Sequence, residues 1–177
     1  MKLLFVLIAL LGMPSTNALV APDDPIVGSS LYYLDSSPTN LWKASTIIHS
    51  TMSNVTLPAQ VPGDLLSDLK TAGMIDEPYY EVNFINSSLW DDNVWTYSIQ
   101  FSTSDVLESN VNIDGGDGAL LVFDGIKMGA EITLNGIKLG MAVDQFSRWE
   151  YDVTKTLLSP LNDGQNILEV SFDKATW

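Results

Sequence analysis

Alternation of apolar and polar residues with a period of two is the feature that most constrains the fold of this chain. From Trp95 to Phe101, aromatic or aliphatic residues occupy every second position, and Thr, Ser and Gln lie between them. Successive side chains of a strand point to opposite faces, so this pattern predicts a half-buried strand. Similar runs recur between turn signals about every ten residues. The sequence therefore predicts an all-β chain made of many short strands.

Asn135-Gly136 gives the strongest prediction of local structure. It separates two alternating runs, one containing Ile132 and Leu134 and the other containing Ile137 and Leu139. A two-residue type I′ turn needs positive φ at both central residues, which Asn-Gly tolerates, so a β-hairpin is predicted here. Further strands are predicted by their apolar content at residues 31–34, 41–44, 120–123, 149–153 and 168–172.

Only one helix of more than a single turn is predicted. Pro62-Gly63-Asp64 precedes Leu65, Leu66 and Leu69, which share one helical face, and Gly73 is placed to end the segment. A single helical turn is expected at residues 154–158, before Pro160. Many strands with so little helix indicate a β-sandwich.

The N-terminus has the order of a secretory signal. Lys2 is followed by an unbroken apolar run from Leu3 to Leu11, and small or polar residues then lead to Ala18. We predict a signal peptide over residues 1–18, with Ala21 as a second candidate for the cut, and a single domain over residues 19–177. Asn54-Val55-Thr56 and Asn86-Ser87-Ser88 are acceptor sequences for N-linked glycans, so glycosylation is predicted at Asn54 and Asn86.

The charge of the chain limits its partners. It has 22 acidic and eight basic side chains, a formal net charge of −14. Such a field repels phosphate backbones and anionic lipids, which argues against nucleic acid or a membrane surface as a partner. A neutral sugar is compatible with it. The chain has no Cys, so its stability must come from the packed core.

No catalytic or metal-binding constellation is predicted, and no cofactor. Retaining glycosidases need two carboxyl groups about 5–5.5 Å apart, but the acids here fall mainly in turns, where solvated charge is the default. His49 is the only histidine and is expected to be exposed or at the edge of the core. The segment Asn110–Gly118 resembles the opening of a calcium loop. Its twelfth position, however, is Leu121 rather than a glutamate, so a plain turn is favoured and calcium is left open.

Trp90, Asp91, Asp92 and Asn93 form the most ligand-like cluster. An indole can stack on a pyranose ring while carboxylates and amides bind its hydroxyls, so these four residues are the candidate sugar-binding site. The alternative is a polar loop whose tryptophan packs on the sandwich or on a neighbouring domain, and we favour it modestly because Trp is a common interface anchor. By their strand patterns, core positions are expected for Trp42, Trp95 and Trp149.

A series of short motifs resembles the N-terminal domain of β-mannosidases, which belong to glycoside hydrolase family 2. The similarity extends from about Leu41 to Phe172, and the order and spacing of its motifs are specific. The motifs are Val61-Pro62-Gly63-Asp64-Leu65, Gly73-Met74-Ile75-Asp76-Glu77-Pro78-Tyr79-Tyr80 with Asn83, Trp90, Trp95-Thr96-Tyr97, Phe123-Asp124-Gly125-Ile126, Ile132-Thr133-Leu134-Asn135-Gly136 with Leu139-Gly140, Phe146, Tyr151-Asp152-Val153-Thr154 and Asn166-Ile167-Leu168.

The resemblance implies an all-β, jelly-roll sandwich of the galactose-binding type, placed before an Ig-like domain and a catalytic barrel. The family's two catalytic glutamates lie in that barrel. The family domain also continues into a Gly-Trp-Asp-Trp-Gly-Pro segment and a closing strand. Neither is found here, so we expect a sandwich incomplete at its C-terminal end, with an unpaired edge or groove and a tendency to aggregate.

Two functions are compatible with these observations. The first is the non-catalytic N-terminal domain of a β-mannosidase-like glycosidase, packed on a catalytic barrel within the full enzyme, which hydrolyses terminal β-linked mannose. The second is a free-standing secreted carbohydrate-binding module without activity. Either is expected in the secretory pathway, in a lysosome or vacuole or outside the cell.

Overall fold

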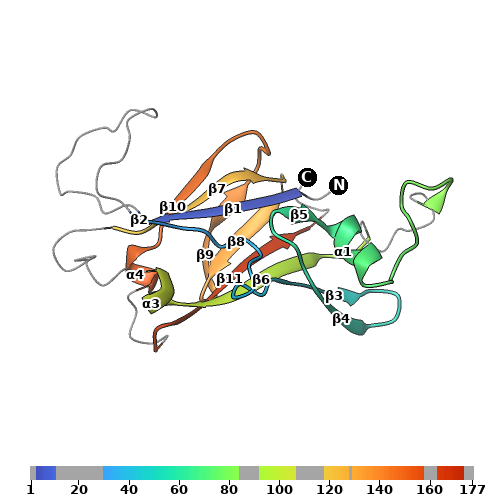
Figure 1. The fold of residues 1–177 in the computed structure, drawn as a ribbon, viewed down its shortest axis with the longest axis horizontal. Coiled ribbons are helices and arrows are strands. Elements are labelled where there is room, and N and C mark those ends of the chain that lie inside the picture. The colour runs from blue at the N-terminus through green and yellow to red at the C-terminus, as the bar shows by residue number, and fades with distance from the viewer. Residues whose placement is uncertain are drawn as a thin grey trace.

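The computed structural model describes residues 3–10, 30–83, 92–106, 118–127, 129–157 and 163–173, which form two antiparallel sheets (Figure 1). The larger sheet has six strands in the order β4-β3-β6-β11-β8-β9. Its strands are β3 (Lys43–Ile48), β4 (Ser53–Pro58), β6 (Trp95–Ser102), β8 (Ala130–Leu134), β9 (Ile137–Ala142) and β11 (Gln165–Phe172). The all-β sandwich predicted from the alternation is confirmed.

The second sheet has five strands, in the order β10-β7-β1-β2, with β5 paired to β1. Its strands are β1 (Leu3–Leu10), β2 (Ser30–Tyr32), β5 (Gly63–Asp64), β7 (Leu120–Ile126) and β10 (Trp149–Asp152). β1 falls within the predicted signal peptide, yet here it lies between β7 on one side and β2 and β5 on the other.

The core lies between the sheets, and its largest fully buried side chains are aromatic. Tyr97 and Phe172 meet edge to face with their ring centroids 5.9 Å apart, and Phe123 meets Tyr151 at 6.2 Å. Such edge-to-face pairs add about 0.5–1.5 kcal/mol beyond the burial of their area. Trp42 and Trp95 are buried, as predicted, whereas Trp149 is only partly buried against the core.

The helix α1 (Leu65–Thr71) begins and ends where its sequence predicts. Asp64 is the N-cap, and its Oδ1 accepts a hydrogen bond from the Ser67 N–H at 3.1 Å. Gly73, just beyond the helix, has φ +68°, a conformation that glycine adopts without strain. α4 (Thr154–Leu157) matches the predicted helical turn, and α3 (Thr103–Val106) is a further turn that was not predicted.

The hairpin between β8 and β9 is also confirmed. Asn135 and Gly136 have φ of 54° and 74°, the two positive values that a type I′ turn requires.

Among the residues that the structure describes, no helix is long and apolar enough to cross a membrane.

Candidate functional site

The described residues of the predicted sugar-binding site and a polar groove lie at one end of the six-stranded sheet. The register places Trp95 opposite Phe172, Phe172 opposite Ala130, and Ala130 opposite Ala142. These four residues form one row across β6, β11, β8 and β9. We call this the exit end, because β11 ends there. The segment before β6, the loop after β9 and the β3–β4 turn all extend beyond this row.

Two of the four predicted sugar-binding residues are described, and both lie at the exit end. Asp92 is exposed, whereas Asn93 is 7% exposed and its Oδ1 accepts a hydrogen bond from the His49 N–H at 3.0 Å. The Asn93 side chain therefore fixes the start of the β3–β4 turn. Trp90 and Asp91 lie outside the described residues. His49 is exposed, as expected.

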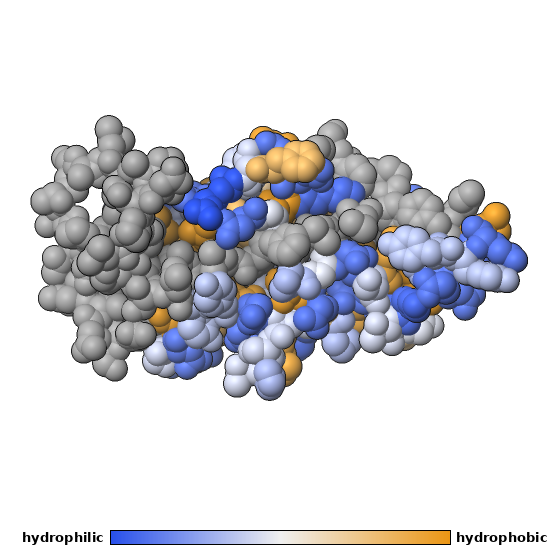
Figure 2. Space-filling model, turned by 45° about the horizontal axis from the view of Figure 1, so that its top comes forward, coloured by the Kyte–Doolittle hydropathy of each residue, from blue (hydrophilic) through white to orange (hydrophobic). Residues whose placement is uncertain are grey.

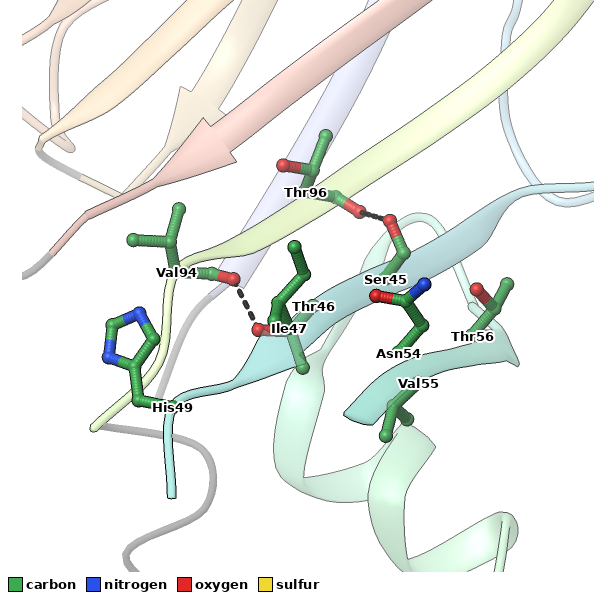
Figure 3. A pocket seen from close by; sticks show the side chains of 9 residues that line it. All are labelled: Ser45, Thr46, Ile47, His49, Asn54, Val55, Thr56, Val94 and Thr96. Atoms are coloured by element: carbon green, nitrogen blue, oxygen red, sulfur yellow. Dashed lines mark hydrogen bonds between the residues drawn. The ribbon is translucent and has the colours of Figure 1, made fainter. Parts of the chain in front are cut away.

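A shallow groove of about 460 Å³ lies beside Asn93, over β3, β4 and the start of β6 (Figure 3). The Thr46 hydroxyl donates to the Val94 carbonyl at 2.6 Å and ties β3 to the entry of β6. Hydroxyl and amide groups on this groove can hydrogen-bond to sugar hydroxyls, and its short apolar side chains can contact a ring face. The groove is lined by Ser45, Thr46, Ile47, His49, Asn54, Val55, Thr56, Val94 and Thr96.

The sequon residue Asn54 lies on this groove. It is exposed on β4, the edge strand of the six-stranded sheet, and its register partner is Ile47 of β3. An attached glycan would therefore begin at the rim of the groove. Asn86 lies outside the described residues, so its environment is not part of the fold seen here.

The candidate calcium loop is described only at Gly118, and residues 110–117 lie outside the described part of the chain. Within the described ranges, no group of three or more His, Cys, Asp or Glu side chains could hold a metal ion. Calcium binding by the Asn110–Gly118 loop therefore stays a prediction.

Sequence reasoning missed a buried polar pair that joins α1 to the core. Asp68 is 6% exposed, and its carboxylate accepts hydrogen bonds from the Gln60 N–H at 3.0 Å and from the Tyr97 hydroxyl at 3.1 Å. Burial raises the pKa of Asp68, against the lowering effect of the two hydrogen bonds. Burial also raises the pKa of Tyr97, and so does its proximity to Asp68. This pair is structural, since both groups are committed to partners inside the domain.

These features define an antiparallel β-sandwich whose loops gather, with a polar groove, at one end. The family model described as glycosyl hydrolase 2 galactose-binding domain-like matches residues 42–177. The chain belongs to this family.

Curated relatives give a consistent picture. A β-mannosidase of Rattus norvegicus is 32% identical over 120 residues, which are 68% of this chain and 13% of that protein. β-Mannosidase A of Aspergillus niger is 32% identical over 158 residues, 89% of this chain and 15% of that protein. The chain thus spans about an eighth to a seventh of the length of these relatives.

A solved structure extends the similarity to three dimensions. The β-D-mannosidase of Dictyoglomus thermophilum superposes with a TM-score of 0.60 and 27% sequence identity. The match covers 78% of this chain and 15% of that protein. The predicted relationship to the N-terminal domain of family 2 β-mannosidases is therefore confirmed.

Proposed function

We propose that this chain is the non-catalytic N-terminal domain of a β-mannosidase-like exoglycosidase, which hydrolyses terminal β-linked mannose in glycans with retention of configuration. The observation that carries the proposal is the similarity to β-mannosidases from a mammal, a fungus and a bacterium over most of this chain. In this proposal the catalytic acids belong to a barrel elsewhere in the polypeptide, and the sandwich packs on that barrel and helps to shape the sugar pocket.

The acids of this domain that bind neighbouring groups support a structural role. Asp64 caps α1, Asp68 holds Gln60 and Tyr97, and Asp144 accepts hydrogen bonds from Phe146 and Ser147. Each carboxylate accepts hydrogen bonds that fix the fold, whereas a glycosidase acid must be directed at a substrate oxygen.

The intact mass of the native protein tests the proposal. The protein is captured from its source with an antibody raised against residues 19–177, deglycosylated and weighed. A mass several-fold above that of this chain is expected, together with hydrolysis of an aryl β-mannoside in preference to the matching β-galactoside. A native mass equal to this chain, with no hydrolysis of either compound, would overturn the proposal.

The segment Trp90–Asn93 supplies a second test, which separates the domain of an enzyme from a free-standing binding module. A binding module is expected to bind glycans weakly and directly, and to lose that binding on Trp90→Ala. The proposed domain is expected to show no heat of binding with mannosides, galactosides or oligosaccharides when titrated alone. Tyr33→Ala is the control, because Tyr33 is an exposed aromatic residue outside this cluster.

We also propose that the protein enters the secretory route and reaches a lysosome, a vacuole or the cell exterior. The order of charge, apolar run and small residues at the N-terminus supports this, as does the exposed position of Asn54 on an edge strand. Secretion of a glycosylated product that lacks residues 1–18 is the expected result, checked by N-terminal sequencing.

A further inference from the structure

Exposed hydrophobic side chains are concentrated at the exit end and on the segment after α1, which lies on the same side of the molecule as the β3–β4 turn (Figure 1). Scattered exposed apolar residues are normal in soluble proteins, but here eight of the twelve large ones in the described residues extend beyond the Trp95–Ala142 row or follow α1. The eight are Ile47, Met52, Met74, Tyr79, Tyr80, Val82, Val143 and Phe146, and the other four are Tyr33, Leu41, Ile137 and Ile167. Figure 1 places the segment that follows α1 at the right-hand end of the molecule, and Figure 2 shows small hydrophobic patches within a mostly hydrophilic surface at that end.

The most exposed of these side chains is carried by a loop that is held in place. Phe146 is 87% exposed, between β9 and β10. The Asp144 carboxylate accepts from the Phe146 N–H at 3.0 Å and from the Ser147 hydroxyl at 2.5 Å, and the Asp144 carbonyl accepts from the Trp149 indole at 2.9 Å. The hydrogen bond from Ser147 lowers the pKa of Asp144. The loop thus presents an aromatic ring to solvent in a fixed position.

The segment after α1 presents two tyrosines in a similar way. Tyr79 and Tyr80 are 78% and 61% exposed. The backbone beneath them is fixed at Glu77, whose carbonyl accepts from the Tyr80 N–H at 3.1 Å and from the Asn83 amide at 3.0 Å, and whose carboxylate pairs with Lys70. Aromatic side chains on a fixed backbone lose little entropy on binding, which makes them good anchors for an interface.

The path of the chain indicates which part of a longer polypeptide contacts this surface. β11 ends at Phe172, in the same row as Ala142, and Ala142 is the last residue before the loop that carries Val143 and Phe146. Any polypeptide that continues from β11 leaves the sandwich beside this loop. In the curated relatives the matched region is only 13–15% of the protein, so a large part of a related protein needs a surface on which to pack.

We propose that the exit end, with Phe146 and Tyr79–Tyr80 as its anchors, is the surface on which the following domain of the same polypeptide docks. This inference rests on the proposed function, because it requires a longer polypeptide, and it adds the face and the residues that make the contact. Docking buries these rings at an interface of the size usual between domains, about 600–1,500 Å². The β3–β4 turn with Met52 forms one margin of the docking surface, and a glycan at Asn54 would limit it on that side.

Hydroxyl-radical footprinting of the native protein tests the proposal. Oxidation rates of Tyr79, Tyr80 and Phe146 are each divided by the rate in the urea-unfolded protein. Tyr33 is the internal control, because it has the same reactive ring as Tyr79 and Tyr80, is 53% exposed and directly follows β2 of the second sheet. We expect the three anchors to react several-fold more slowly than Tyr33, although each is more exposed than Tyr33 in the isolated domain.

A pair of variants locates the interface. Phe146→Ser in the native protein is expected to raise the oxidation of Tyr79 and Tyr80, because it weakens the contact that covers them. Ile137→Ser is the matched control: Ile137 is 55% exposed in the hairpin at the other end of β9, and its replacement is expected to leave those rates unchanged.

The outcomes separate this inference from the proposed function. A native mass several-fold above this chain with anchors as reactive as Tyr33 would overturn the docking surface and leave the proposed function standing. Protection that appears only when a mannoside is added would assign the surface to sugar and overturn the inference. A native mass equal to this chain, or to two copies of it, would overturn both.

Discussion

Asp68 gives the sharpest test of how this fold is held together. Its replacement by alanine leaves the Tyr97 hydroxyl buried without its acceptor and removes the acceptor of the part-buried Gln60 N–H. An unsatisfied buried donor costs about 1–3 kcal/mol and an ordinary hydrogen bond contributes about 0.5–1.5 kcal/mol, so the variant is expected to lose roughly 1.5–4.5 kcal/mol of unfolding free energy. Native domains have only about 5–15 kcal/mol in total. The loss therefore represents a large fraction of the stability.

Urea unfolding followed by tryptophan fluorescence measures this loss, since Trp42 and Trp95 are buried and report on the core. Asp68→Asn is the matched variant, because its side-chain carbonyl can still accept from Gln60 and its amide can donate to the Tyr97 oxygen. It should cost less than about 1 kcal/mol at neutral pH. Asp76→Ala, at an exposed acid, should stay within about 0.5 kcal/mol of the parent.

The raised pKa of Asp68 sets the direction in which the stability of the fold changes with pH. The folded pKa of Asp68 is raised above its ordinary value of 3.8, chiefly by burial. The folded state therefore binds the proton more tightly than the unfolded state. This contribution to stability is complete below pH 3.8 and is lost as the pH rises through the folded pKa. The parent should gain stability relative to Asp68→Asn as the pH falls through that window. A gain with rising pH, or a loss below about 1 kcal/mol for Asp68→Ala, would refute this account of the pair.

Three further predictions concern single side chains. The Tyr151 hydroxyl is buried without a hydrogen-bond partner among the described residues. Tyr151→Phe should therefore leave the unfolding free energy unchanged or raise it by up to about 1 kcal/mol, with a melting temperature equal to or above that of the parent. A clearly lower melting temperature would reveal a partner for that hydroxyl. Gly136 has φ +74° with open space around the position of a Cβ, so Gly136→Ala should cost roughly 1–2 kcal/mol from backbone strain alone, whereas Gly118→Ala, where φ is not positive, should cost less in the same urea titration. Asn54→Gln, expressed in a secreting eukaryotic cell, should remove one glycan from the intact mass, and an unchanged mass would show that Asn54 carries none.

Features set by local sequence could be predicted, because the residues that determine them are adjacent in the chain. The Asn135-Gly136 turn, the Asp64 cap with Gly73, and the alternation of β6 and β11 all belong to this group. β4 was missed. Its only inward apolar residues are Val55 and Leu57, on either side of Thr56, and the strand ends at a proline, so the apolar pattern is too short to distinguish it from a loop.

The candidate site was predicted less well, because it depends on strand order. Phe146 lies at the end where β11 finishes only because β8 lies between β11 and β9, and no residue near Phe146 encodes that order. Asp68 was hidden for a related reason: a carboxylate within an amphipathic helix predicts a solvated face, and only the packing of α1 against Tyr97 places it inside. Asn93 belonged to a cluster read as sugar-binding, and the structure shows that its carbonyl oxygen accepts from the His49 backbone.

β1 lies wholly within the predicted signal peptide, so cleavage after Ala18 and folding with β1 in the sheet would require the same eight residues. Cleavage there would take away the strand that lies between β7 and the pair β2 and β5. β7 would then keep β10 on one side and expose a row of unpaired amides and carbonyls on the other. The vacancy would be one strand wide and antiparallel to β7. Such processing would therefore leave the domain as a template for strand addition until another extended segment fills the gap.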